Sequence, residues 1–350
     1  MTYRIRPSAR LISTIGKDLV KDKFAAIVEL VKNSYDADAT YAYISIEYKE
    51  EDKQLSIAVE DDGHGMNLDT VVNTWLVPAT PDKLDRKTSK GGRPLQGRKG
   101  IGRFAAAVLG TEIYLLSKQD RFAEVFLTLD LKDFSKDKFL EDVPVVIEKG
   151  AKGSSKGTVI EATSHNVIAD AAADMWSTKE KGKLLTELKK LLAPSEVEKV
   201  SKKLGYIKKE DTFSIQIEFK GLPNIDDEII DIEPFDIVEM YDYRMHGEID
   251  KDGNATLSYF NQNTPSIPEE KITIRIYLED KISQAYPGKI NFDFRVFDRD
   301  PESIDELINR GLVDPATGER AGKRKAREIL DEYYGVSLYR GMFRIRPYGD

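Results

Sequence analysis

The sequence predicts an α+β protein in which helices pack on a β-sheet and a second domain follows. Three observations carry this prediction. The chain has 350 residues, a length that favours two domains. Residues 23–36 follow the pattern of an amphipathic helix, and residues 40–48 and 54–60 follow that of strands. The hydrophobic fraction of 40% is typical of a globular protein with a real core.

The predicted helix over residues 23–36 has two chemically different faces. Its apolar side chains recur with the period of a helix, at Phe24, Ile27, Val28, Val31 and Tyr35. Glu29, Asn33 and Asp36 are spaced i, i+4 and i+7 and therefore share the opposite face. We expect the apolar face to lie on the sheet and the polar row to face a cavity.

Two predicted strands come directly after this helix. Residues 40–48 and 54–60 are expected to form a hairpin across the polar turn at residues 49–53. Asp61 ends the second strand, and the chain then enters a Gly-His-Gly turn. This places a carboxylate at the end of a strand, next to a turn.

The next part of the chain alternates helices and strands. Residues 67–77 predict a helix, whereas residues 78–96 combine prolines and glycines with many charges and predict a mobile loop. The alanine-rich stretch 102–109 predicts a closely packed helix. Three strands and a leucine-rich helix are then expected at 112–118, 122–130, 157–162 and 181–192.

The second half begins near Thr212 with the strand pattern of residues 213–219. Strands and helices then alternate, with strands at 272–278, 290–298 and 336–346 and helices at 301–310 and 321–334. We therefore divide the chain into a first domain of residues 1–206 and a second α/β domain of residues 207–350.

Composition and charge exclude several classes of function. The chain has no cysteine, so disulfides and thiolate chemistry are excluded, and its three scattered histidines do not favour a histidine-built metal site. The N-terminus lacks the apolar core of a signal peptide, and no apolar run has the length of a membrane span. We expect a cytoplasmic protein with no membrane partner. The net charge of −8 argues against a broad nucleic-acid-coating surface but permits a local basic groove.

Three short blocks, taken in order, indicate a nucleotide pocket. They are the polar row of residues 29–36, the turn Asp61-Asp-Gly-His-Gly65 and the loop Gly97-Arg-Lys-Gly-Ile-Gly102. Carboxylate and amide groups in the first block can activate water and hold Mg²⁺. A buried carboxylate in the second would accept the amine of adenine, and glycine N–H groups in the third would bind phosphate.

Other nucleotide motifs do not fit these residues. A P-loop needs Gly-x4-Gly-Lys-Ser/Thr, which the chain lacks, and a dinucleotide fold needs Gly-x-Gly-x-x-Gly, whereas the order here is reversed. Each block alone also has an ordinary explanation, such as an exposed helical glutamate, an Asp-Gly turn or solvated basic residues. Only their order and spacing together favour the pocket.

The three blocks resemble those of the Bergerat-fold, or GHKL, ATPases, which include gyrase, the ninety-kilodalton heat-shock chaperones, MutL, MORC and the sensor histidine kinases. Residues 29–40 are most similar to MutL, residues 97–104 are more similar to the chaperones, and the likeness covers residues 8–162. It implies an α/β sandwich, a mixed sheet with helices on one face, followed by a transducer-like α/β domain. Residues 336–345 resemble part of the chaperone middle domain. On that register we expect the second domain to be incomplete at its C-terminus.

The resemblance implies a role for each residue of the pocket. Glu29 would be the general base, Asn33 the protein ligand of Mg²⁺, and Asp36 a binding residue of the pocket wall. Asp61 would accept the adenine amine, Thr158 would share its bound water, and Gly63, Gly65 and Met66 would lie next to the ring. The loop over residues 78–96 would be the ATP lid. Phosphate contacts are expected from Lys90, Gly97, Arg98, Lys99, Gly100, Ile101, Gly102, Arg103 and Phe104.

The expected activity is Mg²⁺-dependent ATP hydrolysis that drives a switch. ATP would close the lid and bring two chains together as a homodimer, which would act on a protein client or nucleic acid through regions beyond residue 350. A basic residue of the second domain, needed against the terminal phosphate, would also lie beyond that point. The basic cluster of Lys83, Arg86, Lys87, Lys90 and Arg93 is explained by a lid over phosphates. Two alternatives remain, namely a non-hydrolysing nucleotide-sensing scaffold and a histidine-kinase-like phosphotransferase.

Overall fold

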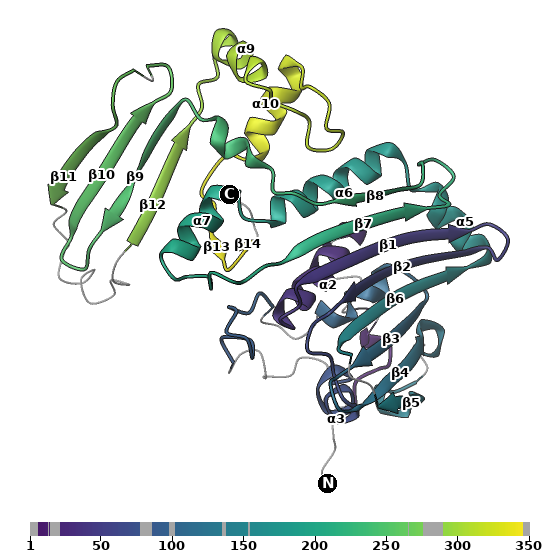
Figure 1. The fold of residues 1–350 in the computed structure, drawn as a ribbon. Helices are drawn as coiled ribbons and strands as arrows, with labels where there is room; N and C mark the ends of the chain where they lie inside the picture. The colour runs from purple at the N-terminus through teal and green to yellow at the C-terminus, as the bar shows by residue number, and fades with distance from the viewer. Residues whose placement is uncertain are drawn as a thin grey trace. The chain divides into compact units, whose positions relative to one another are not determined.

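The computed structural model describes residues 6–12, 14, 22–77, 86–97, 102–134, 138–152, 155–264, 266–275 and 290–345, without the side chains of residues 102 and 103. Apart from the last two residues, the chain divides into two compact units. The first comprises Met1–Phe235 together with Val336–Tyr348, and the second is Asp236–Gly335. The second unit is therefore inserted, along the chain, between two parts of the first (Figure 1).

An eight-stranded sheet forms the centre of the first unit, in the order β5-β4-β3-β6-β2-β1-β7-β8. Its strands are β1 (Tyr41–Lys49), β2 (Gln54–Asp61), β3 (Glu112–Lys118), β4 (Ala123–Asp130), β5 (Ile147–Lys152), β6 (Gly157–His165), β7 (Ser214–Lys220) and β8 (Glu228–Asp231). The strand β7 runs parallel to β1, and the other pairs are antiparallel. The sheet is thus mixed, as the sequence predicts.

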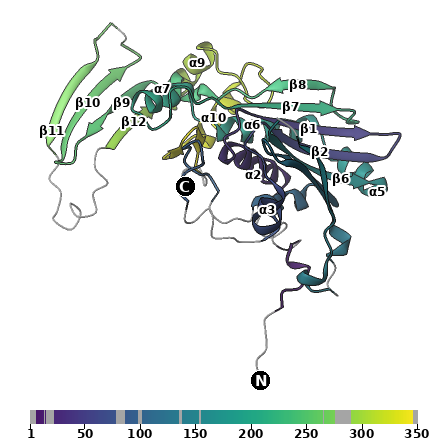
Figure 2. The same ribbon diagram turned by 60° about the horizontal axis from the view of Figure 1, so that its bottom comes forward.

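Helices cover the apolar face of this sheet (Figures 1 and 2). They are α2 (Lys23–Asp36), α5 (Asn166–Asp174) and α6 (Thr178–Leu191), with the 3₁₀ helix η2 (Gly102–Val108). The helix α7 (Ser195–Lys203) follows α6 and has no buried residue. Burial alternates along the strands, so that Ala42, Ile44 and Ile46 of β1 are buried against the helices. Their neighbours Tyr41 and Tyr43 are on the other face.

Short helical turns fill the connections of the first unit. The helix α3 (Leu68–Thr70) continues as the π-turn η1 (Val71–Trp75), and two 3₁₀ turns follow β4, η3 (Leu131–Asp133) and η4 (Leu140–Asp142). A small hairpin of β13 (Tyr339–Arg340) and β14 (Phe343–Arg344) also belongs to this unit. Among the described residues, no helix has both the length and the hydropathy that crossing a membrane requires.

The second unit is built on a four-stranded antiparallel sheet, in the order β11-β10-β9-β12. Its elements are η5 (Asp236–Met240), β9 (Tyr243–Ile249), β10 (Asn254–Asn261), β11 (Glu270–Arg275), β12 (Ile290–Val296), α9 (Pro301–Asn309) and α10 (Lys323–Glu332). The helices α9 and α10 pack on each other through Ile304, Leu307, Ile329 and Leu330, which are all buried.

The structure differs from the sequence prediction mainly in where strands pair. Residues 213–219 were expected in the second domain, but β7 pairs with β1 in register from Tyr41↔Ser214 to Glu47↔Lys220. The division expected at residue 206 therefore falls inside the first unit, and the chain contacts divide at residue 235 instead. The strand expected at residues 336–346 is the short β13–β14 hairpin, also in the first unit.

Candidate nucleotide site

The helix α2 carries the polar row as predicted. It begins with Asp22, whose carboxylate accepts a hydrogen bond from the Ala25 N–H at 2.8 Å, a side-chain N-cap. Glu29 is partly exposed, and its Oε1 accepts a hydrogen bond from Lys32 Nζ at 2.8 Å. Asn33 is also partly exposed, whereas Asp36, in the last turn, is buried. The row therefore runs from a partly exposed carboxylate to a buried one.

The buried carboxylate of Asp36 holds the start of the glycine-rich loop. It accepts hydrogen bonds from the backbone N–H of Gln96 at 2.7 Å and of Gly97 at 3.1 Å. Bonds from a carboxylate to two successive N–H groups are charge-assisted and geometrically specific. The first and third blocks are thus joined, and Asp36 has a structural task that the sequence did not indicate.

The remainder of this loop is only partly described. Arg98, Lys99, Gly100 and Ile101 lie outside the described residues, and so does the side chain of Arg103. Gly102 begins η2, and Phe104 is buried in the core with its ring centroid 6.2 Å from that of Trp75. The phenyl ring of Phe104 is therefore a core group, and only its backbone is a candidate for phosphate contact.

Asp61 lies at the end of β2 and is buried against α2. Its carboxylate accepts a hydrogen bond from the Gly63 N–H at 2.9 Å, and the Ser34 hydroxyl and the Thr158 N–H also bond to it. Burial raises the pKa of Asp61 to about 6, because the hydrogen bonds offset only part of the cost of desolvation. The second block therefore also meets α2, at Ser34, two residues before Asp36.

The turn after Asp61 is packed too tightly for side chains at its glycines. A Cβ at Gly63 would lie 2.8 Å from both the Cβ and the carbonyl oxygen of Ala37. Gly65 has a φ of +63°, and its Cβ would collide with the backbone of Lys118. The sequence attributed both glycines to the approach of adenine, whereas the contacts here are with the protein's own chain.

His64, inside this turn, has a structural role. Its Nδ1 lies 2.6 Å from the carbonyl oxygen of Ala37. Burial lowers the pKa of His64, and the nearby positive charge of Lys90 lowers it further. Since a carbonyl only accepts hydrogen bonds, neutral His64 donates through Nδ1. Lys90 itself is exposed, so the lid carries a cation close to the second block.

Ser117 of β3 is a site residue that the sequence did not reveal. It is fully buried, and its Oγ accepts a hydrogen bond from the Met66 N–H at 2.8 Å and lies 3.1 Å from Thr158 Oγ1. Thr158 pairs with Asp61 in the β2–β6 register. Ser117 thus connects both sides of the pocket, and the available signal was a serine at an inward position after Ile113 and Leu115.

The second half of the expected lid is fastened to α2 rather than loose. Asp38 accepts hydrogen bonds from the Ser89 hydroxyl at 2.5 Å and the Gly91 N–H at 2.7 Å. Arg93 is buried, and its guanidinium donates to Asp211 Oδ1 at 2.6 Å and to the carbonyl oxygen of Ala39 at 2.6 Å. Assigning Arg93 to the phosphate-facing cluster was therefore wrong, because its hydrogen-bonding groups face the protein.

Replacing Arg93 by methionine is expected to lower the free energy of unfolding by about 3–5 kcal/mol, because Asp211 would keep a buried charge without its partner. Urea denaturation followed by circular dichroism measures this. Lys199→Met removes an exposed ion pair at 3.9 Å and should cost less than about 1 kcal/mol. Equal losses in both variants would contradict the structural role of Arg93.

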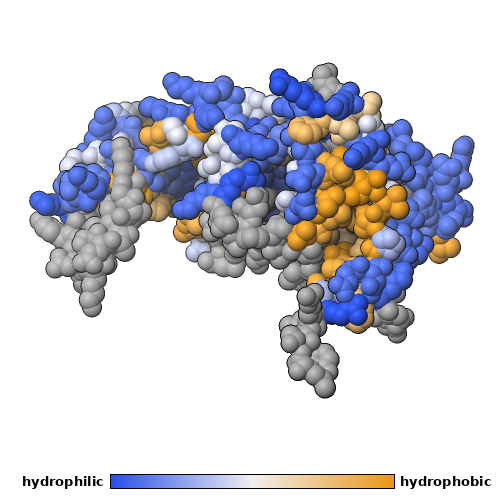
Figure 3. Space-filling view, turned by 90° about the horizontal axis from the view of Figure 1, so that it is seen from below, coloured by the Kyte–Doolittle hydropathy of each residue, from blue (hydrophilic) through white to orange (hydrophobic). Residues whose placement is uncertain are grey.

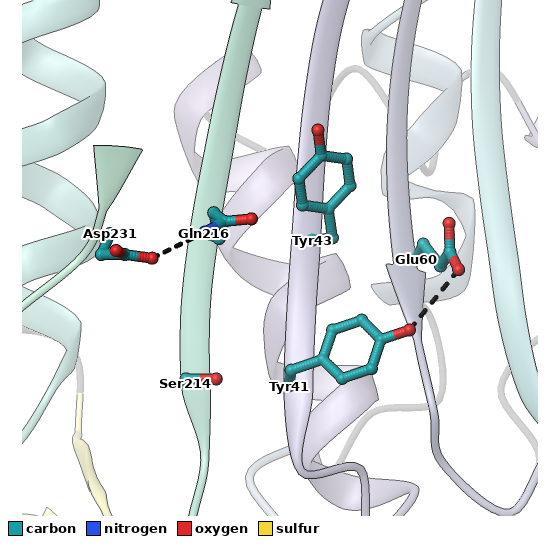
Figure 4. A pocket seen from close by; sticks show the side chains of 6 residues that line it. All are labelled: Tyr41, Tyr43, Glu60, Ser214, Gln216 and Asp231. Atoms are coloured by element: carbon teal, nitrogen blue, oxygen red, sulfur yellow. Dashed lines mark hydrogen bonds between the residues drawn. The ribbon is translucent and has the colours of Figure 1, made fainter. Parts of the chain in front are cut away.

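A separate depression lies on the opposite face of the large sheet. It has a volume of about 350 Å³ and is lined by Tyr41, Tyr43, Glu60, Ser214, Gln216 and Asp231. Figure 4 shows these side chains on one side of the sheet with helices behind it. Tyr41 and Tyr43 alternate with buried Ala42 and Ile44, so the depression faces away from α2. None of the three blocks supplies a lining residue of the depression.

Comparison with known proteins gives a family match for one segment of the chain. Residues 22–158 match the family described as histidine kinase-, DNA gyrase B- and HSP90-like ATPases. The chain is also 29% identical over 100 residues to the putative type II restriction enzyme HgiDII of Herpetosiphon aurantiacus. That alignment covers 29% of this chain and 15% of the relative. The matched family segment contains all three blocks and ends at Thr158. Residues 22–158 of the chain are thus similar to the GHKL-type ATPases.

Proposed function

We propose that this chain binds ATP with Mg²⁺ beside the polar face of α2 and hydrolyses it. The observation that carries the proposal is the meeting of three distant blocks on the last two turns of one helix. Ser34 bonds to Asp61, and Asp36 bonds to the backbone of Gln96 and Gly97. These bonds bring the residues that would read the base and the start of the loop that would bind phosphate to the helix that carries Glu29.

The residues of the second block suit adenine. Asp61 accepts hydrogen bonds when ionised, which matches the exocyclic amine of adenine and opposes the carbonyl that guanine presents there. Ser117 holds the hydroxyl of Thr158 and the backbone of Met66 in place next to it. Asp61 and Thr158 would therefore read the base, and Met66 would support the ring.

The donor set fits Mg²⁺ held by phosphates better than a metal held by the protein. Among the described residues, no group of three His, Cys, Asp or Glu side chains could enclose a metal ion. Asn33 provides one neutral oxygen on the polar face of α2, and Mg²⁺ commonly takes few protein ligands together with waters and phosphate oxygens. Bound there, Mg²⁺ would offset phosphate charge.

Glu29 would orient the attacking water, one helical turn before Asn33. Positioning supplies most of the catalysis in phosphoryl transfer, and a carboxylate fixed on a rigid helix suits that task. The N–H groups of the loop after Gly97, as far as Gly102, would hold the phosphates together with Arg98, Lys99, Arg103 and the lid residue Lys90. Gly97, whose N–H donates to Asp36, would set the start of the loop. Gly100, Ile101 and Phe104 would contribute through their backbone.

We further propose that ATP closes the lid and joins two chains. The face of the first unit seen in Figure 3 carries a broad area of hydrophobic residues, and such areas often mark contact surfaces. The partner acted on would be a protein client or nucleic acid, and the similarity to a putative type II restriction enzyme favours nucleic acid. We place this activity in the cytoplasm.

The test combines titration calorimetry, phosphate release and light scattering on the whole chain. A non-hydrolysable ATP analogue should bind with Mg²⁺ and more weakly with EDTA, and ATP should release phosphate. The analogue should also shift the mass from monomer to dimer. Absence of any binding would overturn the proposal, whereas binding without a mass change would remove only the dimerisation.

One observation favours the non-hydrolysing alternative. Glu29 is engaged by Lys32 at 2.8 Å, and a carboxylate held this way is drawn away from an incoming water. Binding of the analogue without phosphate release would support a nucleotide sensor. Phosphate appearing on a histidine of the chain would instead support the histidine-kinase-like alternative.

A further inference from the structure

We propose that the β13–β14 hairpin, acting through Gln96, positions the glycine-rich loop and is therefore part of the nucleotide site. The hairpin lies at residues 339–344, far beyond the family-matched segment 22–158. This inference rests on the proposed ATP binding. It adds residues to the site that neither the motifs nor the family comparison indicates.

The hairpin contacts the residues just before the glycine-rich loop. The side-chain amide of Gln96 donates to the carbonyl oxygen of Arg340 at 2.7 Å and to that of Pro94 at 3.1 Å. In return, Arg340 Nη1 donates to the carbonyl oxygen of Leu95 at 3.3 Å. The hairpin and the loop entrance are thus joined in both directions.

The helix α2 also holds Gln96, through its backbone. The backbone N–H of Gln96 donates to Asp36 at 2.7 Å, and the next N–H, that of Gly97, also donates to Asp36. Gln96 is therefore held through its backbone by the helix and through its side chain by the hairpin. Because Gly97 is the next residue, these bonds set where the phosphate loop begins.

The hairpin itself packs on α2, through Tyr35. The Met342 N–H donates to the Tyr35 hydroxyl at 3.4 Å, and the rings of Tyr35 and Phe343 lie 4.7 Å apart. Gly341 has a φ of +61°, and a Cβ there would lie 2.5 Å from Tyr35 Oη. Tyr35 precedes Asp36, so one helical turn supports both the hairpin and the loop.

The consequence is a linkage between the nucleotide and the hairpin. Phosphate bound to the loop would restrain Gly97 and hence Gln96, and this restraint would reach Arg340 through the side-chain amide. Binding and order are reciprocal, so loosening the hairpin should weaken nucleotide binding.

Gln96→Ala tests the linkage, with Gln262→Ala as the matched control, because Gln262 is exposed and lies in the other unit. Loss of one hydrogen bond should weaken binding of the ATP analogue about three- to tenfold. In the wild type, the analogue should slow hydrogen exchange at the Met342 amide. In Gln96→Ala this protection should be lost, whereas a merely structural role would leave it.

A second pair of variants loosens the hairpin from its other side. Gly341→Ala and Gly205→Ala both place alanine at a positive φ, but only the first collides with Tyr35, since nothing lies within 4 Å of Gly205. Gly341→Ala should weaken the analogue's binding, and Gly205→Ala should not. If Gly341→Ala does not fold, Gln96→Ala alone decides.

The outcomes separate the two proposals. A wild-type chain that binds no nucleotide defeats the proposed function itself. A wild-type chain that binds the analogue without slower exchange at Met342, together with unchanged affinity in Gln96→Ala, overturns the hairpin linkage only.

Discussion

Glu29→Gln is expected to reduce phosphate release by a factor of about 10² to 10⁴, the usual contribution of a positioned base or water-orienting group. The amide keeps the size of the carboxylate but attracts the water proton poorly. Loss of the carboxylate should therefore lower kcat, while the affinity for a non-hydrolysable analogue stays within about threefold of the wild-type value. Steady-state phosphate release and calorimetry measure the two quantities separately.

The control for this prediction is Glu198→Gln. Glu198 lies on a helix, as Glu29 does, and it pairs with Lys202 one turn later at 2.7 Å. Its replacement removes a comparable ion pair away from the three blocks and should leave both kcat and affinity unchanged. If Glu29→Gln and Glu198→Gln hydrolyse ATP equally well, Glu29 is not the water-orienting group.

Asp61→Asn is expected to weaken ATP binding about ten- to a hundredfold, and at the same time to stabilise the protein. The weaker binding follows because a hydrogen bond to a charged acceptor contributes about 1.5–3 kcal/mol. The amide also offers donors to the adenine amine, which is itself a donor. The ratio of the affinities for ATP and GTP should decrease as well, because the amide no longer favours the adenine amine over the guanine carbonyl. Calorimetry with both nucleotides measures the two effects.

The stabilisation has a defined pH dependence. Burial raises the pKa of Asp61 from 3.8 to about 6, so the folded state binds the proton more tightly than the unfolded state. Wild-type stability therefore falls as the pH rises from about 4 to about 6 and stays lower above that window, by about 3 kcal/mol. Asp61→Asn removes this loss, so its advantage should be present at pH 8 and absent near pH 4.

The neighbouring Asp62→Asn is the control and should behave in the opposite way. Burial alone would raise the pKa of Asp62, but hydrogen bonds from the hydroxyl and N–H of Thr40 more than offset this and lower it. Its charged form is therefore stabilised by folding, and Asp62→Asn should lower the melting temperature at pH 8. Thermal denaturation of both variants across the pH range measures these shifts. If the melting temperatures of Asp61→Asn and Asp62→Asn change in the same direction, the assigned pKa shifts of the two carboxylates are contradicted.

Local patterns were enough to predict the helix and strands around the first two blocks. The helix expected at residues 23–36 is α2 with the same limits, because its period is regular and the chain turns at Ala37. The expected hairpin of residues 40–48 and 54–60 is β1 paired with β2. In both cases the interacting residues are close in sequence, so a short stretch of sequence includes both partners of each contact.

Partners distant in sequence were not predictable in this way. Periodicity showed a strand near residues 213–219 but not that it would lie parallel to β1, some 170 residues earlier. The same holds for the hydrogen bonds that Asp36 accepts from the loop and for the contacts of Ser117 with Met66 and Thr158. Both depend on segments that are distant in sequence lying next to each other in the fold. Arg93 shows the same limit, since a basic residue in a charged loop gives no sign of a buried acidic partner at Asp211.

The contact between Tyr35 and the Met342 backbone joins residues 307 positions apart. During synthesis, α2 emerges early, while the segment that covers its tyrosine emerges only after the whole of Asp236–Gly335 has been made. Contacts of such long separation close late and slowly. The rings of Tyr35 and Phe213 therefore lack their contact with Phe343 until the end of the chain has been made, and apolar surface exposed in this way is prone to aggregation.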